Sequence, residues 1–315
     1  MEKEKEGILL KSRSLRACVA DGFRLYLGQF KRIFRCTWVV ALVFAAVKGL
    51  FGTYYVTEYP RLKIAMQTGS ADWSQLGSML AVVAVGSLLM LVVGGLLASY
   101  VFSMLNAHKA TAEIPWTPKV LHFDRKAAWR MATAVLWALL FSVVVVGIGA
   151  GVAMLGKSVL SPMAATGLLV VVLLTLGVLM VPLYYVFYKY LLTPGLKFTN
   201  VLRTGYAIGM RHLGSLLAVV IVTSLVVDMV ALLLSLPMQI LDMANIQAQT
   251  GVLIGDPLGM PTYMPKLTAA VFTLASFLQA YVLMAAAFPL YYAYGSIEAD
   301  EEERSKAQKN IQKGA

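Results

Sequence analysis

The feature that most constrains this chain is a succession of long apolar runs separated by charged connections. The six runs lie at 37–56, 78–104, 131–155, 167–188, 213–238 and 268–293. Each is close to the ~20 residues that a helix needs to cross ~30 Å of hydrocarbon. Several runs are rich in valine, but a spanning strand has only ~9–11 residues and alternates polar with apolar positions. We therefore expect an all-α integral membrane protein with six transmembrane helices.

The composition supports this class of protein. Only 14% of the residues are charged, against about 25% in soluble domains, so a soluble fold would have little polar material for its surface. We expect three parts: a cytoplasmic segment at 1–36, a transmembrane domain at 37–293 and a charged cytoplasmic tail at 294–315. Residues 1–36 lack the pattern of a cleaved signal peptide, and the first apolar run is expected to act as an uncleaved anchor.

The positions of lysine and arginine predict the orientation. The N-terminal segment, the connections at 105–130 and 189–212 and the C-terminal tail together hold 22 of these residues, whereas the other three connections hold four. Because cytoplasmic loops carry the excess of basic residues, both termini are expected on the inner side of a bacterial cytoplasmic membrane. The net charge of +11 is then a signal of topology and of anionic lipid. No nucleic-acid partner is expected, since no soluble domain supports a basic face.

The N-terminal segment contains a pattern typical of an amphipathic helix at 12–35. Its apolar positions follow a helical stripe: Leu15, Val19, Phe23, Tyr26, Leu27, Phe30 and Phe34. The other faces carry basic residues, and five of them are candidate contacts for lipid headgroups: Arg16, Arg24, Lys31, Arg32 and Arg35. Such a helix lies in the headgroup plane. The alternative is a helix packed on the cytoplasmic ends of the bundle, and both interpretations place it at the membrane surface.

Short motifs recur along the chain and suggest internal repeats. Pro-Leu-Tyr-Tyr at 182–185 returns at 289–292, and Leu-Arg followed by Gly at 202–209 echoes the same pattern at 15–22. This grouping predicts three hairpins of spans, and symmetry-related helices often enclose a central site. Pro182 and Pro289 each free a backbone carbonyl and favour a kink. The kinks either open a lipid-accessible groove on the cytoplasmic side or simply serve hairpin geometry. The tyrosines near them are expected in an interfacial aromatic belt.

Three polar residues inside the apolar runs form the candidate intramembrane site: Lys48, Asp228 and Gln279. Lys48 lies about 16 Å beyond Thr37 and Asp228 about 22 Å beyond Leu213 at the rise of an α-helix. Charges in the membrane are costly and often functional. The functional interpretation is an ion or proton site that faces a cavity. The structural interpretations are a Lys48–Asp228 ion pair between helices, which we expect to couple the two residues energetically, or a Lys48 side chain that reaches outwards.

Other motifs do not predict chemistry. Residues 151–158 match the phosphate-loop pattern G-x-x-x-x-G-K-S, but no strand precedes them, and coincidence is the better interpretation. The glycines four apart at 147–151, and Gly94 with Ala98, are typical of close approach between membrane helices. No metal-ligand spacing joins the three histidines, and Cys18 and Cys36 are too few for a disulfide framework. We expect no metal, cofactor or catalytic residue.

The stretch Val181–Gly214 carries the one family resemblance. It holds the end of a span, a short turn and a helix, Phe198–Gly214, that leads into the next span. In this it resembles a loose group of uncharacterised bacterial six-helix membrane proteins, related to the membrane domain of certain glycerophosphodiester phosphodiesterases. The resemblance implies a six-helix fold and supplies no catalytic residues, because no hydrolase domain is attached.

The function expected from these features is a non-enzymatic, multi-pass membrane protein that organises lipids or a partner complex. Anionic lipids are the expected partners, together with a protein partner or further copies of the chain. The alternative is a small transporter or permease whose polar residues face a water-filled cavity. A third class, an intramembrane enzyme, would gather several polar groups at one depth, and the sequence offers no such set.

Overall fold

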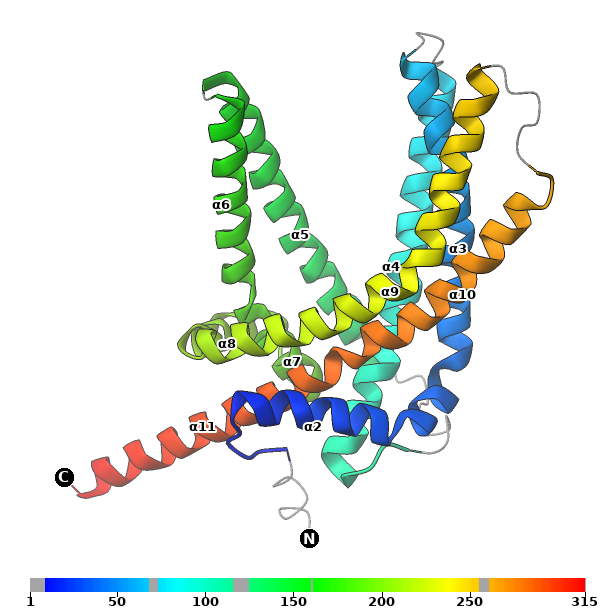
Figure 1. The fold of residues 1–315 in the computed structure, drawn as a ribbon. Coiled ribbons are helices and arrows are strands. Elements are labelled where there is room, and N and C mark those ends of the chain that lie inside the picture. Colours follow the sequence, from blue (N-terminus) through cyan, green and yellow to red (C-terminus); the bar gives the residue numbers. More distant parts are fainter. Residues whose placement is uncertain (1–8, 68–72, 116–124, 160, 255–260, 315) are drawn as a thin grey trace. The chain divides into compact units, whose positions relative to one another are not determined.

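The computed structural model describes residues 9–67, 73–115, 125–159, 161–254 and 261–314, which are helical and contain no strand (Figure 1). The first half of this part holds α2 (Leu15–Gly28), α3 (Phe30–Gln67), α4 (Trp73–Thr111) and α5 (Arg125–Val159). The second half holds α6 (Pro162–Met180), α7 (Pro182–Leu192), α8 (Phe198–Arg211), α9 (Leu213–Ile254), α10 (Met264–Ala285) and α11 (Ala287–Gly314).

Six helical segments of the described chain are long and apolar enough to cross a membrane. They are Phe30–Pro60, Leu76–Thr111, Trp129–Gly156, Pro162–Leu192, Leu213–Ala248 and Met264–Gln312. The prediction of six helices long and apolar enough to span a membrane is therefore confirmed. Two helices run beyond the ends expected at 56 and 238. α3 continues through Pro60 to Gln67, and α9 continues through Pro237 to Ile254. The connections expected at 57–77 and 239–267 are thus partly helical, and residues 255–260 lie outside the described part.

The chain divides into two compact units, each described by itself below. The first unit comprises Met1–Ile33, Val101–Ser224 and Ala287–Ala315, and the second comprises Phe34–Tyr100 and Leu225–Ala286. The boundaries fall inside α3, α4 and α9, so each of these helices contributes to both units.

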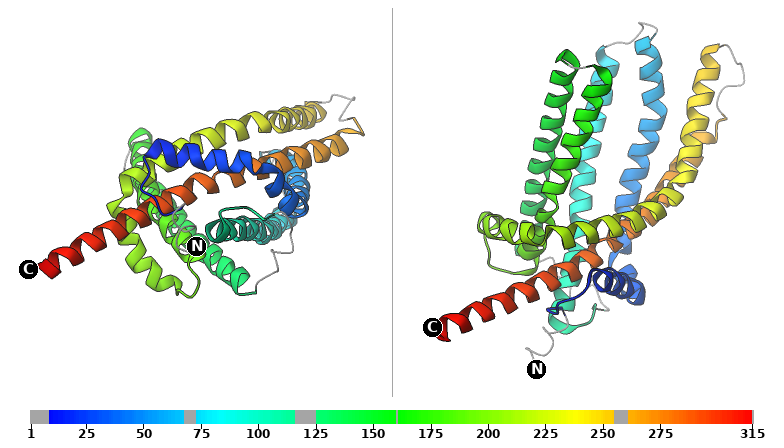
Figure 2. Two further views of the ribbon diagram at one scale, coloured as in Figure 1. Left: turned by 90° about the horizontal axis from the view of Figure 1, so that it is seen from below. Right: turned by 60° about the vertical axis from the view of Figure 1, so that its left-hand side comes forward.

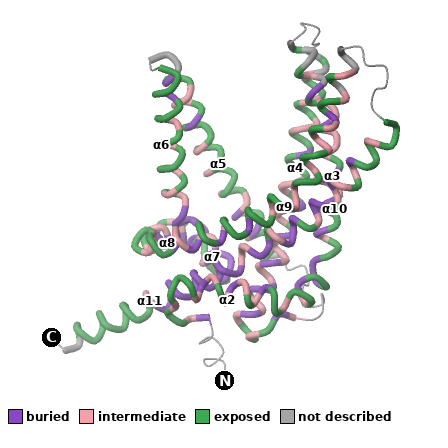
Figure 3. Tube along the Cα trace, viewed as in Figure 1, coloured by how far each residue is buried: buried purple, intermediate pink, exposed green. Residues whose placement is uncertain are grey.

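In the first unit, helices pack in pairs: α2 on α11, α7 on α8, and α5 on α6 (Figures 1 and 2). Buried side chains gather on α2, α7 and the first half of α11, whereas α5 and α6 are largely exposed (Figure 3). Because α5 and α6 belong to segments that are long and apolar enough to cross a membrane, their exposed apolar side chains suit contact with lipid. The core of this unit is built mainly by α2, α7 and the first half of α11.

Two glycines make the same contact in two helix pairs of this unit. A Cβ atom on Gly22 of α2 would lie 2.8 Å from the carbonyl carbon of Phe288 and closer still to the Pro289 backbone in α11. A Cβ atom on Gly209 of α8 would lie 3.0 Å from the Pro182 Cα atom in α7. Only glycine allows backbones to approach this closely. The short motifs that recur in the sequence thus mark two equivalent glycine-on-proline contacts, while the grouping into three hairpins stays a prediction.

The α5–α6 hairpin is tight at its connected end, as expected for residues 156–166. A Cβ atom on Gly156 would lie 3.2 Å from the Cβ atom of Ala165, and Gly149 approaches Leu173 equally closely. Gly147 and Gly151, however, face open space. The expectation that this four-residue spacing marks a helix contact is therefore wrong within this structure, because the contact face is set by Gly149 and Gly156.

In the second unit, α3 packs closely on α10. Gly49 lies against the Thr273 backbone, with 2.8 Å between its ideal Cβ position and the Thr273 Cα atom, and Gly52 lies against the ring of Phe272. The ring of Phe34 stacks on that of Tyr281 at a centroid distance of 5.4 Å. Polar side chains join the same helices, and they form the first candidate site.

Candidate functional site

The intramembrane candidate site lies on α10 of the second unit. The Lys48 ammonium group on α3 donates a hydrogen bond of 2.8 Å to Gln279 Oε1. The Gln279 amide nitrogen then donates at 3.4 Å to the Ala231 carbonyl on α9. Gln279 is buried, whereas Lys48 is partly exposed. One amide therefore bridges three helices and satisfies the lysine with a neutral acceptor.

Asp228 does not join this arrangement. Its side chain is exposed on α9, one helical turn from Ala231, and no ion pair between described residues links it to Lys48. The expected pairing within one chain is therefore wrong, because Gln279 occupies the ammonium group and Asp228 lies on another face of α9. An aspartate at the centre of a membrane helix costs about 2.5–3.5 kcal/mol on insertion scales, so an exposed Asp228 is costly for a helix of this kind.

Two apolar grooves lie in the membrane-spanning segments, and none of the three polar residues lines either of them. A groove of about 590 Å³ in the first unit opens between α5 and the junction of α6 with α7. Phe141 and Val145 form one wall, and Leu183 and Phe187 form the other. The Tyr184 ring also borders it. A groove of this kind was one of the two outcomes expected from the kink at Pro182. The other groove, of about 570 Å³, lies along α10 in the second unit.

The basic N-terminal segment forms the second candidate site, and it differs from the expected single helix. The helix at 12–35 is interrupted at Gln29, so that α2 ends at Gly28 and α3 begins at Phe30. The buried face of α2 consists of Cys18, Gly22 and Tyr26, which pack on α11. Most residues of the predicted apolar stripe lie outside this buried face; the Leu27 side chain, for example, is 70% exposed. In this structure α2 packs on α11, while both expected positions, in the headgroup plane or on the cytoplasmic ends of the bundle, stay predictions.

The basic side chains of this segment divide into two groups. Arg16, Arg24, Lys31 and Arg35 are exposed. Arg32 instead donates to Glu113 at 3.2 Å and to the Ile114 carbonyl at 2.9 Å, which fixes the end of α4 to the start of α3. Exposed ion pairs contribute little to stability, so the 4.0 Å contact between Arg24 and Asp21 leaves Arg24 available to an anion.

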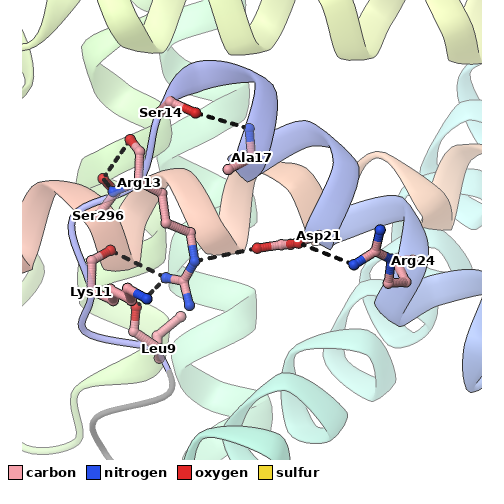
Figure 4. A network of polar contacts seen from close by, with 8 residues as sticks. All are labelled: Leu9, Lys11, Arg13, Ser14, Ala17, Asp21, Arg24 and Ser296. Atoms are coloured by element: carbon pink, nitrogen blue, oxygen red, sulfur yellow. Dashed lines mark hydrogen bonds and ion pairs between the residues drawn. The ribbon is translucent and has the colours of Figure 1, made fainter.

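Arg13 fastens the N-terminal segment to α11 (Figure 4). Its backbone N–H donates to the Ser296 hydroxyl at 2.9 Å, and its guanidinium group lies 3.5 Å from Asp21. The same guanidinium group donates to the Leu9 carbonyl at 2.8 Å and lies over the Tyr292 ring. Ser14 caps the first turn of α2 by accepting from the Ala17 N–H. Beside this network, burial raises the pKa of the Cys18 thiol.

The short helix α7 is held at both ends. At its start the break at Pro182 is bridged by Tyr206 of α8, whose hydroxyl donates to the Leu179 carbonyl at 3.0 Å. At its end, three side chains from α4 and α5 donate to the last carbonyls: Asn106 to Leu191, Lys109 to Leu192, and Arg130 to Thr193 at 2.7 Å. Cations favour a helix C-terminus, so Lys109 and Arg130 have a structural role that their basic character alone did not predict.

The tyrosines expected in an aromatic belt are mostly buried instead. Tyr185, Tyr188, Tyr190, Tyr291, Tyr292 and Tyr294 are buried, and only Tyr184 among the seven is exposed. Tyr188 donates from α7 to the Ala287 carbonyl at 2.7 Å, next to the start of α11. Tyr185 donates to Glu298 at 2.6 Å, and Lys189 pairs with the same carboxylate at 2.8 Å. These side chains join α7 to α11. The hydroxyl groups of Tyr185 and Tyr188 therefore hold two helices together.

The phosphate-loop match lies in a structure that cannot serve as a phosphate loop. Residues 151–158 form the last turns of α5, where helical hydrogen bonds occupy the backbone N–H groups that a phosphate would need. Searches for a matching protein family, a similar curated protein and a similar solved structure found none. The function must therefore be inferred from the sites themselves.

Proposed function

We propose that this chain is a non-enzymatic, multi-pass protein of the bacterial cytoplasmic membrane, with both termini in the cytoplasm, that organises anionic lipids at its inner face. The six apolar helices and the distribution of lysine and arginine support the membrane location and the orientation. The family resemblance at Val181–Gly214 favours the same class of protein and supplies no reaction.

The observation that carries the proposal is the exposed surface of α2 and the first turn of α3. Arg16, Arg24 and Lys31 are exposed there, together with the apolar side chains of Leu27 and Phe30, which are 70% and 39% exposed. Basic and apolar side chains on one surface suit a membrane interface, where the rings and methyl groups enter the acyl boundary and the cations meet headgroups. Each cation near an anionic leaflet contributes about 1 kcal/mol.

The experiment measures the lipids that stay with the full-length protein in mild detergent. The wild type and the variant Arg16→Gln/Arg24→Gln/Lys31→Gln are purified from the same membranes, and the ratio of phosphatidylglycerol to phosphatidylethanolamine is measured by mass spectrometry. We expect the variant to retain several-fold less phosphatidylglycerol, and we expect high salt to reduce the wild-type ratio because it screens the attraction.

The matched control removes the same number of charges from the exposed C-terminal helix. Arg304, Lys306 and Lys309 are exposed on α11, and Arg304→Gln/Lys306→Gln/Lys309→Gln is expected to keep the wild-type lipid ratio. If both triple variants, or neither, lost phosphatidylglycerol, the surface on α2 and α3 would not be a lipid site.

The contact between Lys48 and Gln279 is the observation that favours the second candidate, a transporter or permease. A lysine in a membrane-spanning segment is a candidate for transport until shown otherwise. The test is flux in liposomes: Lys48→Met would abolish a measured flux while the protein stayed folded. A Lys48→Met variant that kept the wild-type flux, or a wild type without any flux above background, would exclude this candidate.

A further inference from the structure

Lys48 and Asp228 are charges of opposite sign deep in the apolar runs of the second unit, and neither contacts the other. The Lys48 ammonium group contacts the neutral amide of Gln279. The Asp228 side chain is exposed on α9, beside Leu225 and Met229, whose side chains are 60% and 63% exposed. No ion pair among the described residues involves either charge. Ionisable groups in membrane helices almost always face an oppositely charged group, a backbone carbonyl or water, so an exposed aspartate on an apolar face calls for a partner.

The contacts of Gln279 relate the positions of the two charges along α9. Gln279 contacts Lys48 on one side and the Ala231 carbonyl on the other, at 2.8 and 3.4 Å. Asp228 precedes Ala231 by three residues, a rise of about 4.5 Å along α9. The four-carbon stem of lysine covers an offset of this size.

We propose that two copies of this chain associate in the membrane through α9, with Lys48 of each copy paired with Asp228 of the other. The proposal rests on the proposed membrane location and is independent of the basic surface on α2. A twofold axis along the membrane normal keeps every residue of the second copy at the depth of the first. The opposite charges therefore meet at one level, and a single self-complementary interface satisfies all four charges.

Charge complementarity is what favours a second copy over other occupants. Lipid tails offer no group that compensates a carboxylate. Lys48 of another copy does, and within the described part of its own chain its ammonium group contacts the neutral amide of Gln279. The exposed apolar side chains around Asp228, such as Leu225, Met229 and Leu232, supply the packing that drives association between membrane helices. Opposite charges arranged in this way also fix the register of the two copies.

The test uses charge reversal in mixed populations. Copies labelled with donor or acceptor dye are reconstituted into liposomes of phosphatidylethanolamine and phosphatidylglycerol, and association is measured by energy transfer over a range of protein-to-lipid ratios. In a Lys48→Glu homodimer both pairs become two acids, and in an Asp228→Lys homodimer both become two bases. Each variant alone is expected to associate about tenfold more weakly than the wild type, as expected for close charge pairs.

Mixing the two variants gives the decisive result. A heterodimer of Lys48→Glu with Asp228→Lys contains one restored pair with its charges exchanged and one wild-type pair, so association should return to the wild-type level. The exposed Lys266→Glu serves as the control and should associate like the wild type. If a reversed variant fails to fold, Lys48→Gln and Asp228→Asn replace it, and each should weaken association less.

Three outcomes would overturn the proposal. The first is a wild type that stays monomeric at all protein-to-lipid ratios. The second is a mixture of the two variants whose association stays as weak as that of each variant alone. The third is a loss of a measured flux in the charge variants without any change in association. None of these results depends on phosphatidylglycerol retention, so failure here is distinct from failure of the proposed lipid site.

Discussion

The substitution Gly22→Ala tests whether α2 is seated on α11. The added Cβ atom would lie 2.8 Å from the carbonyl carbon of Phe288 and closer to the Pro289 backbone, and a backbone cannot turn away as a side chain can. We therefore expect α2 to lift from α11 at an overpacking cost of about 1–3 kcal/mol. Weakening the 2.9 Å bond from the Arg13 N–H to Ser296 adds about 1 kcal/mol. The gain in helix propensity offsets about 1 kcal/mol, which leaves a net loss of about 1–3 kcal/mol.

Gly28→Ala is the matched control on the same helix. Nothing lies within 4 Å of its ideal Cβ position, so the substitution is expected to be neutral or to stabilise by up to about 1 kcal/mol. Both variants are compared in equilibrium unfolding, by titrating a denaturing detergent into mild-detergent micelles and following helicity. If Gly22→Ala were as stable as Gly28→Ala, α2 would not pack on α11, and the buried face described for it would be wrong.

Three further predictions use the same purified protein. Gln279→Leu removes the acceptor of Lys48 and should lower the free energy of unfolding by about 1.5–3 kcal/mol. Gln279→Glu keeps that acceptor and loses the 3.4 Å bond to the Ala231 carbonyl, so its loss should be smaller; equal losses would show that the contact with Lys48 contributes nothing. Burial raises the pKa of the Cys18 thiol, so this thiol stays protonated at neutral pH. It should react with a maleimide far more slowly than the exposed thiol of Ser305→Cys, and its rate should increase as the pH rises. Equal rates for the two thiols at pH 7 would contradict the burial of Cys18. Gly195 has a φ of 89°, and Gly195→Ala should therefore cost about 1–2 kcal/mol in the same unfolding titration, unless the turn after α7 rearranges freely.

The apolar runs predicted the spanning helices well because their length leaves few alternatives. Some 20 consecutive apolar residues satisfy their backbone in lipid only as a helix. Where the helices end was predicted less well. The runs were expected to end at 56 and 238, but α3 continues through Pro60 to Gln67 and α9 through Pro237 to Ile254, since a long helix tolerates the loss of one hydrogen bond.

The packing of α2 on α11 could not be predicted from hydrophobic periodicity. The stripe through Leu15 and Leu27 suggested a membrane-facing surface, yet the packed face centres on Gly22, a residue that carries no hydrophobic signal. A signal did exist, because the spacing of Arg16 and Gly22 recurs at Arg203 and Gly209. Both glycines contact a proline of the repeated Pro-Leu-Tyr-Tyr motif.

The candidate intramembrane site was predicted by residue type but not by pairing. Lys48, Asp228 and Gln279 stood out because polar groups are costly in lipid. Charge alone favoured Lys48 with Asp228, whereas the structure pairs Lys48 with Gln279. Which face of α9 points at α10 depends on the rotation of the helix, and an almost uniformly apolar sequence around Asp228 does not specify that rotation.

The most direct test of the account is the orientation of the chain in the membrane. Single cysteines are placed in a background without Cys18 and Cys36, at positions that the structure shows as exposed: Asn200 and Lys309 on the proposed inner side, and Ser161 and Thr262 on the outer side. A membrane-impermeant maleimide is applied to intact cells before and after permeabilisation. The account predicts that Ser161→Cys and Thr262→Cys are labelled in intact cells, and that Asn200→Cys and Lys309→Cys are labelled only after permeabilisation. Labelling of Asn200→Cys or Lys309→Cys in intact cells would contradict the six-span topology with cytoplasmic termini.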